Sequence, residues 1–560
     1  VATGTVRFQD GEWILPSEIR EADLPAAPAL DGLGAALDER VATLSAAARR
    51  LGEVLAVHGR AAPFQRAMAL ADDDEQRVFD ALAELVQEGF LLEADGALRF
   101  RHDGYREVLL RGLDGERETE LHRRVARQLH HDAGEPRGEI GSHLLRSGDR
   151  DEGAALLEAA GRELYQAQAL ADCLSPLEAA HEVYRARGDS VIARMEILFM
   201  LTAAGWVADR EVGARYQQEA VEAYWHQSGI ALAHRLRWLG RHLALVLALA
   251  WSSLSWLLKP RARRGIAPAE AIAKFSVVLG YACGLTYSAN RREEVEALVA
   301  LVEPLGVFRR RMPYAAYLGM QVFPAILLGR LGYATQLIDE ALDIVATDRL
   351  TPMEDWERRF VEAGLRGLRV IIEVNQFDPR LDEDLLRIDE LGFRYYRLVV
   401  QTARVVRHRY RGEEAEAQDL EREMEAAALQ LGSWSTDLQI LLFAHPAYAL
   451  TGDTSGLKRC GEAIDRFIAE DFRFEDRRAM IRGEYARLRG RHEQALDVLS
   501  GALPDLADDN YLMRQWHGSA LAEAALAAGE HELAVEQARA VIALGTSADH
   551  GVLLPKLRAE

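Results

Sequence analysis

The chain has 560 residues, of which 49% are hydrophobic and 28% are charged. That much apolar material can bury a core, which excludes a disordered or collagen-like chain. Lys and Arg number 67 against 88 Asp and Glu, giving a net charge of −21. A chain this acidic lacks the basic surface that broad nucleic-acid binding requires.

The cysteines and the first residues indicate the cell compartment. Cys173, Cys283 and Cys460 are far apart and form no Cys-x-x-Cys pair, so we expect neither disulfides nor a thiolate metal site, and a cytoplasmic protein. The chain begins at Val1 without the basic and apolar regions of a signal peptide. Because it lacks an initiating Met, we expect it to be the C-terminal part of a longer protein.

Motifs for catalysis are missing from the sequence. It contains neither the phosphate-binding G-x-x-x-x-G-K-[ST] nor the serine-nucleophile G-x-S-x-G. His-Glu occurs at His181, His492 and His531, but none has a second His four residues later, as a helical zinc site would need. We interpret these histidines as polar residues at helix starts. We predict that this chain is not an enzyme and holds no metal or cofactor of its own.

Residues 38–137 differ from the rest of the chain. The pattern predicts a helix over 38–58, a short helix over 63–70 and a third helix capped by Asp74 and ended by Gly89. Asp95-Gly96 between two apolar runs is typical of a tight hairpin turn. Three helices followed by a hairpin is the order of a winged-helix domain. The inward residues of the third helix should be Val78, Phe79, Leu82, Leu85 and Val86.

The charge of this region argues against DNA binding. Residues 38–131 hold 14 Arg and 18 acidic residues, so 14 − 18 = −4. The third helix, which would enter the groove, begins with Asp72, Asp73, Asp74 and Glu75. DNA phosphates would repel these carboxylates.

Residues 138–560 read as amphipathic helices separated by short turns. Each turn holds a Gly or Asn, residues that adopt a positive φ readily. The turn residues recur about every 40 residues, with one longer step of 61, and are Gly148, Gly188, Gly229, Asn290, Gly332, Asn375, Gly412, Gly452, Gly490 and Gly529. Helical hairpins of this kind bury their apolar stripes only by stacking. We therefore predict an all-α chain in which roughly ten hairpins form a superhelical solenoid.

These hairpins resemble tetratricopeptide (TPR) repeats, whose usual period is about 34 residues. The longer period here places them in a looser, TPR-like class. A small residue follows four of the turns after five positions, at Gly153, Ala417, Ala495 and Ala534. A small side chain there would let the second helix of a hairpin approach the first closely.

The long step marks an insertion at residues 239–265. It contains sixteen uncharged residues, from Leu243 to Leu258, with basic residues on both sides. A helix of that length spans about 24 Å, less than the roughly 30 Å of a bilayer core, so we do not expect a transmembrane span. The helix is either buried within the superhelix, which we favour, or exposed and docked on a partner or an anionic membrane surface. Trp251 and Trp256 are candidate docking residues.

The N-terminal region carries a more specific resemblance. The stretches Leu98-Arg-Phe-Arg-His102-Asp103-Gly-Tyr-Arg-Glu-Val-Leu and Glu116-Arg-Glu-Thr-Glu-Leu-His-Arg-Arg-Val-Ala resemble the winged-helix segment, and the segment after it, of STAND-type signal-transduction ATPases, a class that includes bacterial AAA-type and LuxR-type regulators. Asp10-Gly-Glu-Trp-Ile-Leu-Pro16 is similar to the stretch that precedes this domain in the class. A TPR-like array after the winged helix is also usual there.

The resemblance implies a domain order and a nucleotide sensor. Residues 1–37 would link to a preceding ATPase module, 38–137 would be the winged helix, and 138–560 the repeats. His102 would donate a hydrogen bond to the β-phosphate of ADP, and Asp103 would orient the backbone or pair with Arg101 or Arg106. ATP or ADP is expected only with the ATPase module, which this sequence lacks. His102 could instead cap the junction between hairpin and helix.

The resemblance further implies that this chain is the regulatory region of such an ATPase. The repeats would bind a protein or a small-molecule signal, and the winged helix would relay it to the nucleotide-binding module. A stand-alone scaffold for protein partners and a winged-helix transcription regulator are the two alternatives.

Overall fold

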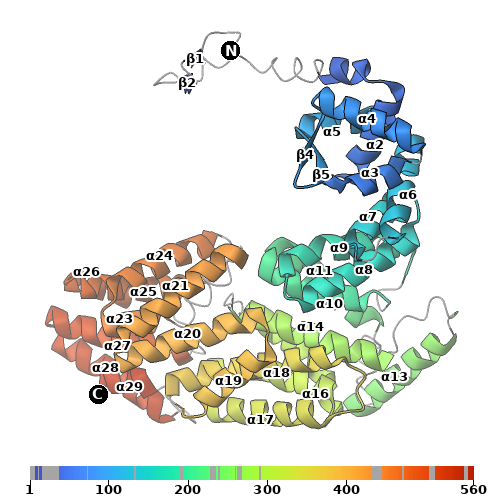
Figure 1. Cartoon of the computed structure of the whole chain (residues 1–560). Helices are drawn as coiled ribbons and strands as arrows, with labels where there is room; N and C mark the ends of the chain where they lie inside the picture. The colour runs from blue at the N-terminus through green and yellow to red at the C-terminus, as the bar shows by residue number, and fades with distance from the viewer. Residues whose placement is uncertain are drawn as a thin grey trace. The chain divides into compact units, whose positions relative to one another are not determined.

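The structure is a computed structural model. It describes residues 7–9, 12–14, 37–71, 73–131, 134–189, 193–227, 232, 235–236, 240–258, 260, 268–288, 292–376, 378–431, 444–469, 472–502, 511–547 and 553–560. The described chain is mainly helical and divides into two compact units, Val1–Ala160 and Gly161–Glu560 (Figure 1). The boundary falls inside α8 (Arg150–Gln166).

The first unit combines helices with two small sheets. Its strands are β1 (Arg7–Gln9), β2 (Glu12–Ile14), β3 (Ala62–Pro63), β4 (Leu91–Ala94) and β5 (Ala97–Phe100). Its helices before α8 are α2 (Ala46–His58), α3 (Phe64–Ala71), α4 (Glu75–Gln87), α5 (Asp103–Arg111), α6 (Gly115–His131) and α7 (Arg137–Arg146). Strands β1 and β2 pair antiparallel, in the region where we expected only a linker. We call α2 to α6 with β3, β4 and β5 the N-terminal module.

The hairpin of the N-terminal module is the predicted one. Asp95 and Gly96 connect β4 and β5, with φ of 55° and 74°, as a tight turn with two positive-φ residues requires. β3 pairs with the other edge of β5, giving an antiparallel sheet of order β3-β5-β4 in which Ala62 is opposite Leu98 and Leu91 is opposite Phe100.

Two predictions for the helices of this module were wrong in detail. The helix expected over 38–58 is interrupted at Leu44, because Ser45 caps a new helix and its hydroxyl accepts a hydrogen bond from the backbone N–H of Ala48 at 3.1 Å. Asp74 caps α4 as expected. However, Phe79 and Val86 are 55% and 41% exposed. They lie beside the core-facing stripe, which consists of Val78, Ala81, Leu82 and Leu85.

The second unit is an array of helical hairpins. Its helices are α9 (Leu170–Ala186), α10 (Met195–Ala208), α11 (Arg210–Gln227), α13 (Arg241–Leu258), α14 (Pro268–Ser288), α15 (Arg292–Val302), the 3-10 helix η4 (Glu303–Val307), α16 (Met312–Leu327), α17 (Leu331–Thr347), α18 (Asp355–Gln376), α19 (Leu381–Leu391), α20 (Arg394–Arg411), α21 (Glu414–Leu431), α23 (His445–Thr451), α24 (Thr454–Ala469), α25 (Glu475–Leu488), α26 (His492–Ala502), α27 (Tyr511–Ala528), α28 (His531–Ser547) and α29 (Leu553–Ala559). Consecutive helices pack on each other along most of the array, as a stack of repeats requires.

Glycines form the turns of these hairpins in most of the predicted places. Positive φ values confirm six predicted turn residues, which are Gly148, Gly188, Gly412, Gly452, Gly490 and Gly529. Two predictions were wrong: Gly332 lies inside α17, whose preceding turn uses Gly329 with φ 71°, and Asn375 lies inside α18. Gly229 and Asn290 lie outside the described residues.

Small residues do allow close approach within the hairpins. A Cβ added to Gly153 of α8 would lie 2.8 Å from the backbone nitrogen of Leu145, and one added to Gly141 of α7 would lie 2.9 Å from the Gly153 carbonyl oxygen. The backbones of α7 and α8 are therefore too close for larger residues there. The small residues at the equivalent positions of three other hairpins, Ala417, Ala495 and Ala534, are all buried.

The array also contains contacts between hairpins that are distant in sequence. Tyr511 of α27 is buried in the core formed by α16 and α17. A Cβ added to Gly329 would lie 2.5 Å from Cγ of Tyr511. In the same unit Tyr165 of α8 packs against Trp356 of α18, with ring centroids 5.4 Å apart. The repeats therefore contact more than their immediate neighbours.

Candidate functional site

His102 and Asp103 lie where β5 leads into α5. His102 is the N-cap residue of α5, with φ −142° and ψ 140°, and its side chain makes no capping hydrogen bond. Asp103 is the first residue of that helix, and both side chains are exposed. Among the described residues, the Asp103 carboxylate forms no ion pair, and Arg106 instead donates from Nε to the Ala56 carbonyl oxygen at 2.9 Å. The position therefore leaves the His102 imidazole available to a ligand.

Two aromatic rings and a guanidinium group lie next to His102. The ring of Tyr105 is 6.1 Å from the His102 ring, and it packs at 4.4 Å on Phe90. The guanidinium of Arg40 lies 5.2 Å from the Tyr105 ring and 5.4 Å from the Phe90 ring, and it donates to the Glu88 carbonyl oxygen at 2.5 Å. These contacts hold the start of α5 against the rest of the module.

A second candidate site is the junction between the N-terminal module and α7. One continuous apolar core contains residues of the module, such as Leu121 and Val125 of α6, together with Ile140 and Leu144 of α7. Leu156 of α8 packs against the same core. The module and the first hairpin thus share one hydrophobic core, so a shift of α7 would disturb packing inside the module.

Ion pairs connect the same two parts. Glu135, just before α7, accepts hydrogen bonds from Arg60 and from Arg66 of α3. Arg60 also pairs with Glu139 of α7 at 2.6 Å. Burial would raise the pKa of Glu135, but the hydrogen bonds from Arg60 and Arg66 outweigh it and lower the pKa. Glu135 is therefore a charged group that fixes α7 to the module.

Three histidines gather at this junction. Nδ1 of His122 in α6 lies 2.8 Å from Nδ1 of His143 in α7. His58, at the end of α2, is 5% exposed, and its Nδ1 lies 3.3 Å from the Arg60 carbonyl oxygen. Burial lowers the pKa of His58 to about 4 and that of His143 to about 3, and it also lowers the pKa of His122. All three are neutral at pH 7.

The predicted insertion is occupied by α13, which is largely exposed. Ala244, Leu245 and Ala248 are buried, and α13 contacts α14 and η4. Trp251 is 61% exposed and Trp256 is partly buried. The buried position that we favoured from the sequence is wrong for most of this helix, because its contact side is narrow and consists mainly of small residues. No helix among the described residues is long and apolar enough to cross a bilayer.

The histidines of the His-Glu pairs differ in their surroundings. His181 is fully buried in the middle of α9, where Nε2 lies 3.1 Å from Glu219 and 3.0 Å from Arg194, so our interpretation as a helix-start residue was wrong.

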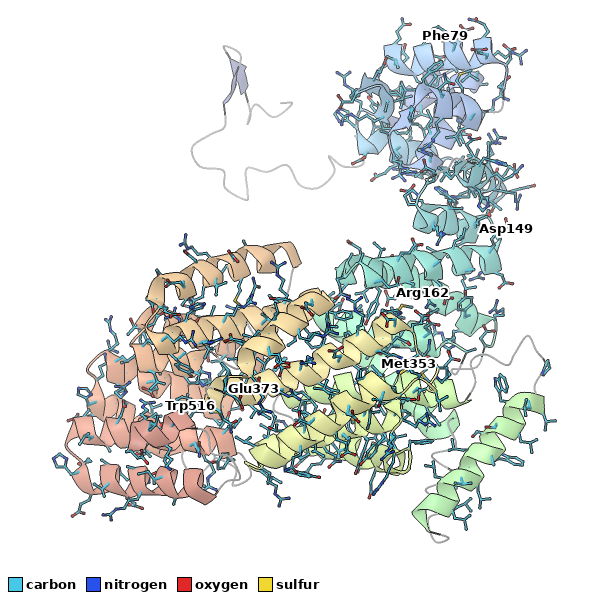
Figure 2. All side chains as sticks on the ribbon, turned by 60° about the horizontal axis from the view of Figure 1, so that its bottom comes forward. Phe79, Asp149, Arg162, Met353, Glu373 and Trp516 are labelled. Atoms are coloured by element: carbon cyan, nitrogen blue, oxygen red, sulfur yellow. The ribbon has the colours of Figure 1, made fainter. Side chains whose placement is uncertain are left out.

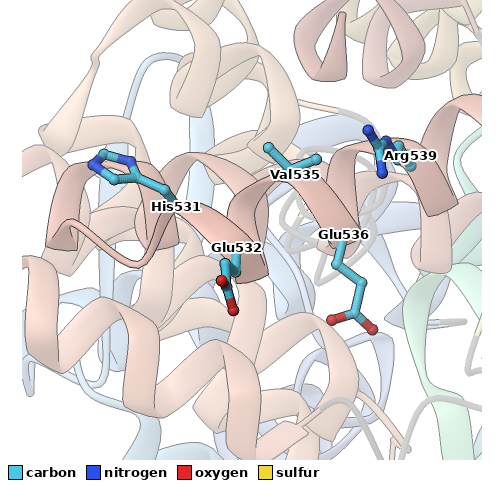
Figure 3. Close-up of a pocket in the computed structure, with 5 residues that line it drawn as sticks. All are labelled: His531, Glu532, Val535, Glu536 and Arg539. Atoms are coloured by element: carbon cyan, nitrogen blue, oxygen red, sulfur yellow. The ribbon is translucent and has the colours of Figure 1, made fainter.

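His531 lies on an open hollow whose lining comes from α28 alone (Figure 3). That lining consists of His531, Glu532, Val535, Glu536 and Arg539, all exposed. Among the described residues, no three His, Cys, Asp or Glu side chains are placed to hold a metal ion.

Comparisons with known proteins do not identify a family for this chain. No family model matches the sequence, and no curated protein matches it. Among solved structures, the chain is similar to a STAND protein with a tetratricopeptide repeat sensor from Pyrococcus horikoshii, with 11% identity and a TM-score of 0.33 over 94% of this chain and 67% of that one. At that TM-score, the likeness supports no conclusion about this chain.

Proposed function

We propose that this chain is the regulatory and sensor region of a STAND-type signalling ATPase. In this proposal the N-terminal module is a winged-helix domain, and the helical array binds a protein or a small-molecule signal. Binding moves α7, and the module transmits the movement to a nucleotide-binding module outside this chain, favouring its active state over its ADP-bound state. The chain itself performs no chemistry.

The junction at α7 is the observation that carries this proposal. The shared core and the Arg60 and Arg66 contacts to Glu135 connect α7 to the module. A change that moves α7 can therefore alter the packing of the module through direct contact. His102 lies on the same module, exposed and available to a phosphate oxygen.

The surface of α4 favours a protein partner over DNA. Phe79 is 55% exposed (Figure 2), and its ring packs edge-on against that of Phe64, itself 39% exposed, at 6.3 Å. Around this pair the helix carries mainly acidic side chains, which are Glu75, Asp80 and Glu84. Exposed aromatic residues are common in protein interfaces, whereas DNA phosphates would repel the carboxylates.

The nucleotide part of the proposal can be tested in a longer protein. We expect the gene to encode a P-loop module before Val1. In a protein containing that module, His102→Ala should weaken ADP binding and raise basal activity, because the β-phosphate loses a donor. Asp95→Asn, in the exposed turn between β4 and β5, is a matched control on the same module. ADP affinity that is unchanged by His102→Ala would contradict the assignment of this site.

A stand-alone scaffold is the second candidate. The module covers the apolar side of α7 at the start of the array, as a capping repeat would. In that case no P-loop module precedes Val1 in the gene, and the junction serves stability only. Deleting the module would then reduce the solubility of the array without changing its affinity for a protein partner.

A further inference from the structure

Most of the large apolar residues of α13 are exposed. Its described exposed side chains lie at positions 243, 246, 247, 250, 251, 253, 254, 257 and 258, a spacing that forms one continuous stripe along a helix. Large apolar residues on this stripe are 42–76% exposed, and they are Leu243, Val246, Leu247, Trp251, Leu254, Leu257 and Leu258. The other exposed residues described on this helix are Ala250 and Ser253. A helix on a water-facing surface would carry polar residues here, so the stripe is suited to another apolar surface.

The charge of the surrounding sequence is as unusual as the stripe. No Asp or Glu occurs between Glu222 and Glu270, although the chain holds 88 acidic residues. The same stretch carries seven basic residues, namely Arg235, Arg237, Arg241, Lys259, Arg261, Arg263 and Arg264. The rest of the chain therefore has a net charge of −21 − 7 = −28. In this strongly acidic protein, the exposed apolar helix therefore lies within a positively charged segment.

From this coincidence we propose that α13 docks on an anionic lipid bilayer, lying in the plane of the membrane surface. A helix in this orientation inserts its apolar stripe between the lipids, and both of its ends lie at the level of the headgroups. Basic residues flank this helix on both sides in the sequence, and such residues are attracted to anionic lipids. A transmembrane orientation would instead place the two ends on opposite sides of the bilayer, where basic residues usually gather on one side only.

Other features of the helix fit an interfacial position. Trp251 is on the exposed stripe, and tryptophan prefers the boundary between headgroups and acyl chains. The contact side of α13 uses Ala244, Leu245 and Ala248, so insertion of the stripe requires no unfolding of the array. The net charge of −28 on the rest of the chain would repel an anionic surface, which favours docking through this segment. This proposal does not depend on the STAND-type function.

Binding of the whole chain to vesicles tests the proposal. We expect the chain to co-sediment with phosphatidylcholine vesicles that contain phosphatidylglycerol, and not with vesicles of phosphatidylcholine alone. Binding should weaken as salt is added, because the electrostatic part of the attraction is screened. Leu254→Glu should weaken binding by at least about tenfold, since it places a carboxylate on the inserted stripe. The control is Leu526→Glu on α27, which is 59% exposed, compared with 49% for Leu254, and should bind like the wild type.

Lipids brominated along the acyl chain provide a second measurement, which needs no charged variant. They should quench the tryptophan fluorescence of the wild-type chain, and Trp251→Phe should reduce that quenching. Equal binding to neutral vesicles, absence of binding to anionic ones, or binding that Leu254→Glu leaves unchanged would each overturn the proposal. So would self-association in sedimentation velocity that Leu254→Glu abolishes, because a second copy of the chain would then cover the stripe.

Discussion

Nδ1 of His122 and Nδ1 of His143 lie 2.8 Å apart, one on the last helix of the N-terminal module and the other on the first helix after it. At this distance one Nδ1 donates a hydrogen bond and the other accepts it, so at least the accepting imidazole is neutral and protonating both rings would break the contact. Glu118 and Arg146 also act on His122, and Arg146, Arg60 and His58 act on His143. The junction is therefore built from groups that protonate near physiological pH when they are exposed to water.

The buried histidines of this junction predict that the first unit becomes less stable at acidic pH. The pKa of His58 is lowered to about 4 and that of His143 to about 3, whereas the unfolded values are about 6.5. Between these values the unfolded chain binds more protons than the folded one, so the free energy of unfolding falls as the pH falls. We expect a lower Tm for the first unit at pH 5 than at pH 7. His143→Gln should flatten this dependence, whereas His131→Gln, at the exposed end of α6, should not.

Glu135 should contribute more to stability than an exposed carboxylate does. Glu135→Ala leaves Arg60 and Arg66 without their shared acceptor, and we expect a loss of about 2 kcal/mol in the free energy of unfolding, measured by urea denaturation. The matched control is Glu120→Ala, which removes an exposed pair with Arg123 and should cost less than about 1 kcal/mol. Equal losses for the two variants would show that the junction is not held by its ion pairs.

The close packing of α7 on α8 makes Gly141 sensitive to a single methyl group. Gly141→Ala would place Cβ 2.9 Å from the Gly153 carbonyl oxygen, and separating the two helices should cost about 1–3 kcal/mol. Gly501→Ala on α26 is the control, because no atom lies within 4 Å of its added Cβ. That change should be neutral or stabilising by up to about 1 kcal/mol. In thermal unfolding, the Tm should therefore fall for Gly141→Ala and stay unchanged or rise for Gly501→Ala.

Glu373 of α18 is a buried carboxyl in the second unit, 1% exposed. Burial and the neighbouring Asp384 raise its pKa to about 8, although Arg380 lies 3.8 Å away. The unfolded carboxyl loses its proton near pH 4.5, so between about 4.5 and 8 the folded state holds more protons and the free energy of unfolding falls as the pH rises. Glu373→Gln should remove this penalty and raise the Tm above that of the wild type at pH 8. A lower Tm at pH 8 would show that Glu373 is a stabilising anion.

Replacing His102 should have almost no effect on the free energy of unfolding. Its side chain is exposed and makes no capping hydrogen bond, so we expect His102→Ala to change the free energy of unfolding by less than about 0.5 kcal/mol. Calorimetry of this chain would check the value. A larger loss would favour the structural role for His102 over nucleotide sensing.

Local patterns predicted much of this fold. Asp95-Gly96 and the glycines at 148, 412, 452, 490 and 529 all form the expected turns, because a positive φ depends on the residue itself. Gly332 was misplaced because Gly329 lies only three residues before it, and both fit the same turn. The sequence also identified α13, but periodicity could not show which side of an apolar helix faces water.

The junction at α7 was missed for a similar reason. His58, His122 and His143 lie far apart in the sequence, and each is ordinary in its own helix. One local feature could have identified them: His122 lies next to Leu121 on a buried helix face, a position where a polar residue needs a partner. The identity of that partner depended on how α7 packs, which the sequence pattern does not determine.

Tyr511 has a consequence for how the array unfolds. In a purely linear repeat protein, terminal units can detach one at a time. Here the aromatic ring of α27 is buried between α16 and α17, so the last hairpins cannot detach without opening the middle of the array. We expect this to couple the stretch from α16 to α29 into one cooperative folding unit, with slow folding because residues distant along the chain must meet before the core is complete.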